Sequence, residues 1–155
     1  MAVGTTAELA DMIAQDPDCD LAAADHDFYY APEISTWETR PSLVGSGQCV
    51  ALNQAACGAP HTAHWRKGPK VRGNDGLVVG TAIAAFDHRG RYPNHAAGNH
   101  AELFVALSDD GIVVVDQWAH KRPPRPSRRI IEFRNGVGTA SDDGDRFWVA
   151  VAPRG

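Results

Sequence analysis

The order of its segments predicts an α+β domain, with helices first and an antiparallel sheet of about five strands after them. Two observations carry this prediction. Before residue 60, apolar residues recur at helical spacing and one apolar segment is stopped by glycine. After residue 77, the chain consists of short β-branched or aromatic runs separated by Gly, Asp, Asn and Pro. Helices followed by a run of strands indicate helices packed on a single sheet.

Composition narrows the class of protein. Of 155 residues, 43% are apolar and 22% are charged, which is ordinary for a globular protein and predicts one domain over residues 1–155. Residues 1–44 are expected to form an acidic helix and wrap, and residues 45–152 the core of the domain. A net charge of −4 gives no concentrated basic surface for nucleic acid. Residues 1–15 lack the pattern of a secretion signal, and no apolar run approaches a membrane span.

The first expected helix covers about residues 6–15. Thr5-Thr6-Ala7-Glu8 resembles a capping box, apolar residues follow at helical spacing, and Pro17 stops the segment. Residues 20–44 show no clean period, so we expect a partly irregular wrap anchored by aromatic side chains. Residues 61–66 are expected to form a further helical turn.

A glycine-rich loop, Gly45–Gly47, delivers a cysteine into the first turn of the second expected helix. This helix runs from Cys49 to about Cys57, is expected to have Ser46 as its N-cap, and ends at Gly58. The unpaired N–H groups and positive dipole end of a helix favour a thiolate, so this position favours a reactive cysteine. A buried structural cysteine is the alternative.

Five runs are expected as strands of an antiparallel meander: residues 77–86, 100–107, 112–118, 129–133 and 146–152. Ser108-Asp109-Asp110-Gly111 predicts a hairpin turn between the second and third, because Asp-Gly supplies the positive φ that such turns need.

This hairpin assembles a candidate site. A thiol nucleophile needs a base, usually histidine, and the histidine needs a third group to orient it. His100 opens the second predicted strand, and counting about the turn pairs residue 100 with about residue 119. Asp116 and Gln117 then come within diagonal reach of His100. A one-residue register shift exchanges the two, so the orienting residue stays open between them.

Three motifs in this order carry a family resemblance: Gly47-Gln48-Cys49 before an apolar helix, Gly98–Leu103 opening a strand, and Val115-Asp116-Gln117 on the next strand. Together they resemble papain-like peptidoglycan amidases of the CHAP and NlpC type. Within that group the chain is most similar to small single-domain amidase effectors of type VI secretion. The resemblance covers about residues 40–152 and implies a papain-like fold.

The resemblance also implies roles for individual residues. Cys49 would be the nucleophile, His100 the general base and then acid, and Asp116 the group that orients the imidazole. Gln48 and the backbone N–H of Cys49 are candidates for the oxyanion hole. Where CHAP-type chains usually carry Glu-x-Asn, this chain departs from the pattern, so Gln117 stays an alternative orienting group.

Partners and location are implied by the same resemblance. The substrate would be a peptidoglycan stem peptide, and a cognate immunity protein would be the protein partner. The protein would be made in the bacterial cytoplasm, be secreted without a signal peptide and act in the periplasm of a target cell. No nucleic-acid partner or membrane insertion is expected.

Candidate substrate contacts lie just after Asp116. Trp118 is as readily a groove residue as a core residue. Stem peptides carry several carboxylates, so the basic loop Lys121–Arg129, including Arg122 and Arg125, is a candidate for binding them. The alternative for this loop is an ordinary solvated basic surface.

No metal or other cofactor is predicted. His61, His64 and His95 have no cysteine or carboxylate partners at the spacing of a zinc site, and a thiolate–imidazolium pair explains amide hydrolysis without a cofactor. Two other functions stay open: a catalytically silent papain-like binding or interaction module, and a thiol hydrolase acting on an amide outside the cell wall. The sequence also leaves open a disulfide between Cys19 and Cys57.

Overall fold

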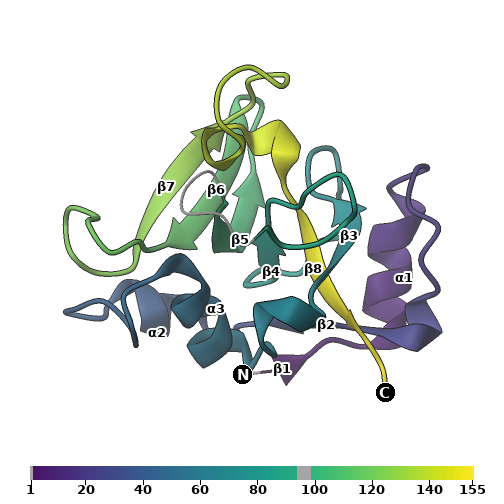
Figure 1. The fold of residues 1–155 in the computed structure, drawn as a ribbon, viewed down its shortest axis with the longest axis horizontal. Coiled ribbons are helices and arrows are strands. Elements are labelled where there is room, and N and C mark those ends of the chain that lie inside the picture. The colour runs from purple at the N-terminus through teal and green to yellow at the C-terminus, as the bar shows by residue number, and fades with distance from the viewer. Residues whose placement is uncertain (1, 94–98) are drawn as a thin grey trace.

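The computed structural model describes residues 2–93 and 99–155. His95, and Gly98 of the strand-opening motif, lie outside these residues. The predicted α+β architecture is confirmed, since helices pack on one antiparallel sheet (Figure 1). No helix in the described ranges is both long and apolar enough to cross a membrane.

The α-helices are α1 (Thr6–Ala14), α2 (Ile34–Glu38) and α3 (Cys49–Cys57). The strands are β1 (Ala2–Val3), β2 (His26–Tyr30), β3 (Arg66–Lys70), β4 (Ala82–Ala84), β5 (Ala101–Leu107), β6 (Gly111–Asp116), β7 (Ser127–Glu132) and β8 (Trp148–Pro153). Short 3₁₀ turns occur at Ala23–Asp25, Thr62–His64, Ala140–Asp142 and Gly144–Arg146.

The sheet is wider than predicted and is not a simple meander. The five predicted strands are β4 to β8, and β1, β2 and β3 come from segments that show no strand pattern. The strand order is β1-β2-β8-β4-β5-β6-β7, with β3 also pairing to β8. The last strand therefore returns to the middle of the sheet instead of following β7. Its continuous buried run, Val149–Ala152, is typical of a strand covered on both faces.

The N-cap of α1 is as the sequence predicts, whereas the N-cap of α3 is not. At α1 the predicted capping box forms, since the Thr5 hydroxyl accepts from the Glu8 N–H at 3.1 Å and the Thr5 N–H donates to Glu8 Oε1 at 2.9 Å. At α3 the prediction of Ser46 as N-cap is wrong. Gln48 is the N-cap residue and makes no side-chain cap bond, while the Ser46 hydroxyl accepts from the Gln48 N–H outside the helix.

Two buried clusters lie on the two faces of the sheet. Successive residues of β4 alternate between them, because side chains of a strand point to opposite faces. Ile83 joins the cluster that contains Met12 of α1, whereas Ala82 and Ala84 join the cluster that contains Leu52 of α3. The strands thus lie between α1 and α3 (Figure 1). Because α3 packs against β5, its first residue comes close to the start of that strand.

Candidate active site

The loop before α3 is held in place by Gln117. The Gln117 Nε2 group donates to the carbonyl oxygens of Val44 and Gln48, both at 2.9 Å, and the Val44 N–H donates to Gln117 Oε1 at 2.8 Å. Gln117 is fully buried, so these bonds are shielded from water. Gly47 adopts a φ of 83°, which a residue with a Cβ rarely takes. The hydrogen bonds of Gln117 and the conformation of Gly47 together fix the position of Cys49 at the start of α3.

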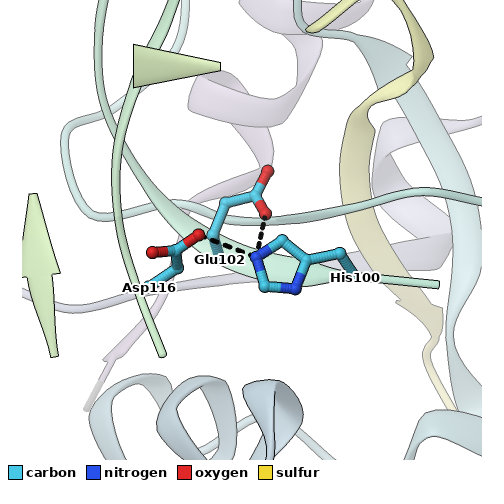
Figure 2. Close-up of side chains that lie close together, drawn as sticks. All are labelled: His100, Glu102 and Asp116. Atoms are coloured by element: carbon cyan, nitrogen blue, oxygen red, sulfur yellow. Dashed lines mark hydrogen bonds and ion pairs between the residues drawn. The ribbon is translucent and has the colours of Figure 1, made fainter. Parts of the chain in front are cut away.

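His100 lies against Asp116, not against Gln117. The β5–β6 ladder pairs Leu103 with Val115, so continuing it brings residue 100 opposite residue 118. His100 Nε2 and Asp116 Oδ2 are 2.7 Å apart (Figure 2). Neighbouring residues of a strand point to opposite sides, which is why Gln117 turns to the loop before α3 and Asp116 turns to the imidazole.

Asp116 is buried and surrounded by cations. Lys121 Nζ lies 2.6 Å from Asp116 Oδ1, and Arg129 Nε lies 2.8 Å from Asp116 Oδ2. Burial would raise the pKa of this carboxyl, but its hydrogen bond to His100 and the charges of His100, Arg129 and Lys121 hold the pKa well below its usual range. Asp116 is therefore an ionised acceptor, and His100 Nε2 is the donor.

The Cys49 thiol lies among groups that act on its ionisation. Burial opposes loss of its proton, but a hydrogen bond to His100 and the charge of His100 outweigh burial and lower the pKa of Cys49. Nδ1 is the imidazole nitrogen left for the sulfur, because Asp116 occupies Nε2. Tyr92 Oη lies 3.5 Å from Cys49 Sγ, and burial raises the pKa of Tyr92, so its hydroxyl stays protonated.

Glu102 and Tyr92 are site residues that the sequence analysis missed. Glu102 is fully buried on β5, and its Oε2 lies 3.3 Å from His100 Nε2 (Figure 2). A signal for it was present, since an acidic residue between Ala101 and Leu103 is out of place in a buried strand. Tyr92 lies between β4 and β5 in the sequence, and only the folded chain brings its hydroxyl to the sulfur.

A hollow of about 270 Å³ opens beside the imidazole, lined by Asn99, His100, Trp118, Arg129, Ser141 and Asp142. Trp118 is 37% exposed there, with its ring centroid 6.2 Å from that of His100. The predicted substrate contact Trp118 therefore borders the site.

The other candidate contacts are placed differently. Gln48 has an exposed side chain, and the described contacts involve only its backbone. Arg122 donates to the carbonyl of Lys121, Arg125 donates to the carbonyl of Glu38, and neither lines the hollow. Lys121 itself is 4% exposed and bound to Asp116, so the prediction that it belongs to a surface loop for substrate is wrong.

The cysteines and the carboxylates complete the inventory of reactive groups. Cys19, Cys49 and Cys57 are all free thiols, so no Cys19–Cys57 disulfide forms.

Three side chains in the described ranges have the spacing of metal ligands. They are His100, Glu102 and Asp116, whose donor atoms all lie within 4.8 Å of one another. Lys121 and Arg129 already lie on Asp116, and their charges oppose a further cation there.

Comparison with known proteins places the chain in a family. Residues 30–150 match the family model of domesticated amidase effector 2. The chain belongs to this family. It is 42% identical over 96 residues to a type VI secretion amidase effector 2 protein of Salmonella typhi, covering 61% of this chain and 71% of that protein. The family match spans Cys49, His100 and Asp116.

A solved structure supports the same assignment. The chain resembles a type 6 secretion amidase effector 2 with a TM-score of 0.70 and 32% sequence identity, over 82% of this chain and 96% of the other. The match confirms the papain-like fold that the sequence motifs implied. It also confirms the resemblance to type VI secretion amidase effectors.

Proposed function

We propose that this member of the family is a cysteine amidase that hydrolyses amide bonds in peptidoglycan stem peptides. Cys49 is the nucleophile, His100 the general base and then acid, and Asp116 the group that orients the imidazole. The observation that carries the proposal is the convergence of three chain segments. The start of α3, the start of β5 and the end of β6 bring a thiol of lowered pKa, an imidazole and an ionised carboxylate together.

The reaction follows from this arrangement. The Cys49 thiolate attacks the carbonyl carbon of the amide, and the carbonyl oxygen becomes an oxyanion near the start of α3, where the backbone N–H of Cys49 is unpaired within the helix. His100 gives its proton to the departing amine, so the C–N bond breaks and a thioester stays on Cys49. His100 then takes a proton from water, which attacks the thioester and releases the carboxylic acid.

The surroundings of the triad support each role. Asp116 holds the proton of the neutral imidazole on Nε2, which leaves Nδ1 free to take up the thiol proton, and Lys121 and Arg129 keep Asp116 ionised. The hollow beside Trp118 is the substrate site in this proposal, with Arg129 available for a substrate carboxylate. Gln48 as an oxyanion donor and Arg122 and Arg125 as substrate contacts stay predictions.

The biological setting follows from the relatives. They are named as type VI secretion amidase effectors, and we infer that this chain is exported in the same way and acts on the cell wall of a target bacterium. A producer of such an enzyme needs an immunity protein that blocks the hollow beside His100.

The test compares the wild-type protein with Cys49→Ala on digested peptidoglycan, with products followed by mass spectrometry. We expect Cys49→Ala to slow cleavage by at least about 10³-fold, because the residual rate then lacks the nucleophile. Cys19→Ala is the matched control, since Cys19 is another free thiol and lies outside the site. Equal cleavage by Cys49→Ala refutes the proposal. Cleavage of other peptides but not of peptidoglycan points to a thiol hydrolase acting elsewhere, and binding without cleavage to a silent module.

A further inference from the structure

A second carboxyl group stands at the catalytic imidazole, and nothing in the triad uses it. Glu102 follows His100 by two residues, so both side chains project from the same face of the strand. The Glu102 side chain is fully buried, and in the described ranges neither carboxyl oxygen has a hydrogen-bond partner. A buried carboxyl without hydrogen bonds is costly. Fold stability therefore does not explain it.

The Glu102 carboxyl group lies against one atom of the imidazole, His100 Nε2. Figure 2 shows both carboxyl groups directed at the same imidazole nitrogen of His100, whose other nitrogen points away. Asp116 accepts the hydrogen bond from the Nε2–H group at 2.7 Å, which leaves Glu102 Oε2 at 3.3 Å without a donor of its own. The backbone fixes this position, since Asn53 of α3 donates to the Glu102 carbonyl at 2.9 Å.

We propose that Glu102 is a positioning residue for His100, and that its ionised carboxylate holds the imidazole in the protonated form. This inference rests on the proposed function, because it assigns Glu102 to the same thiolate–imidazolium pair. The two carboxyl groups then have different roles. Asp116 is ionised, with its charge balanced by Lys121 and Arg129, and orients the ring. Glu102 adds negative charge only when it loses its proton.

The groups around Glu102 favour this division. The ionisable groups that shift the pKa of Glu102 come from four segments: His100 before β5, Asp116 of β6, Arg129 of β7 and Cys49 of α3. The charge of Glu102 in turn contributes to the raised pKa of Tyr92. Its strand partner on β4 is the apolar Ile83. Burial raises the pKa of Glu102 to about 8, with the Asp116 carboxylate adding to the rise and His100 opposing it. Glu102 is therefore mostly neutral at pH 7 and ionises just above it.

The consequence is a wider alkaline range for catalysis. Burial would lower the pKa of His100, but the charge of Glu102, followed by the hydrogen bond to Asp116, raises it to about 10. As Glu102 ionises, the imidazolium gains a neighbouring negative charge and keeps its proton to higher pH. On the acid side Glu102 carries no charge, so it does not affect formation of the thiolate there.

The decisive variant is Glu102→Gln, which keeps the shape and removes the charge. In the pH profile of kcat/KM for peptidoglycan fragments, we expect the alkaline limb to move to lower pH by about one unit or more, and the acid limb to stay in place. Glu102→Asp, which keeps a carboxyl group, should restore part of the shift. A uniform loss of kcat/KM with both limbs in place would show a packing role and overturn the proposal.

A second measurement needs no turnover and no variant. In the wild-type protein, the NMR titration of the His100 ring should show an inflection near pH 8, as Glu102 ionises, before the ring itself loses its proton. The absence of this inflection overturns the proposal even if Glu102→Gln does not fold. The two proposals fail separately: an active Cys49→Ala variant refutes the amidase mechanism, whereas a His100 titration without the inflection refutes the role of Glu102 alone.

Discussion

Cys49 and Cys57 stand at the first and last residues of α3 and meet different surroundings. Cys49 lies beside His100 and Tyr92, and its pKa is lowered because the hydrogen bond to His100 and the charge of His100 outweigh burial. Cys57 is 1% exposed against the apolar cluster under α3, and burial raises its pKa to about 12. The thiol at the first residue of the helix therefore ionises more readily than the thiol at the last residue.

The comparison shows what a helix terminus contributes to the reactivity of a cysteine. The dipole of a helix end is worth about 0.3–1 kcal/mol, which is less than one pKa unit. Desolvation of a buried thiol shifts its pKa by more than that, as Cys57 shows. Cys49 is also largely covered, so the helix start by itself does not account for its lowered pKa. The neighbouring imidazole decides the difference.

The largest expected effect is in alkylation. At pH 7 a thiol with a pKa of about 12 has a thiolate fraction on the order of 10⁻⁵, whereas an unperturbed cysteine is a few per cent ionised. Iodoacetamide should therefore modify Cys49 at least about 10³-fold faster than Cys57, as peptide mapping by mass spectrometry measures. His100→Gln should remove most of the advantage of Cys49 below neutral pH. An unchanged rate for Cys49 in His100→Gln would mean that the helix start, and not the imidazole, sets reactivity.

A smaller effect is expected from removing the hydrogen bonds that hold the loop before Cys49. Gln117→Leu removes three hydrogen bonds and leaves the Val44 N–H without its partner, whereas the Val44 and Gln48 carbonyls still accept from the N–H groups of Gly47 and Ala51. We expect a loss of about 1–3 kcal/mol in the free energy of unfolding, measured in urea. Alkylation of Cys49 should slow several-fold, because the loop then holds the sulfur less firmly against His100. A stability loss with unchanged alkylation would remove Gln117 from the positioning of the nucleophile.

The smallest effect is expected at the other end of the same helix. Gly58 ends α3 in the left-handed region with a φ of 68°, so Gly58→Ala should cost about 1 kcal/mol of unfolding free energy. Alkylation of Cys49 should stay within about twofold of wild type, since the helix start is unchanged. This variant is the stability-matched control for Gln117→Leu. A marked change in Cys49 reactivity here would show that the two ends of α3 are coupled.

The sequence by itself determined the elements whose signals are local. The capping box at Thr5 and the extent of α3 depend on contacts between residues a few positions apart. The Ser108–Gly111 hairpin also forms where it was predicted, but Gly111 does not adopt the positive φ on which that prediction rested. The motif order also led from Cys49 to His100, and to the two candidates on the next strand.

Only the tertiary structure decided which groups share the site. The choice between Asp116 and Gln117 depends on strand register, where one residue reverses the side that is faced. The burial of Glu102 and Lys121 and the approach of Tyr92 to the sulfur depend on contacts between distant segments. The return of β8 to the centre of the sheet is of the same kind. Local sequence carries propensity and periodicity, but desolvation and ion pairing, which set the chemistry here, exist only once remote segments have packed together.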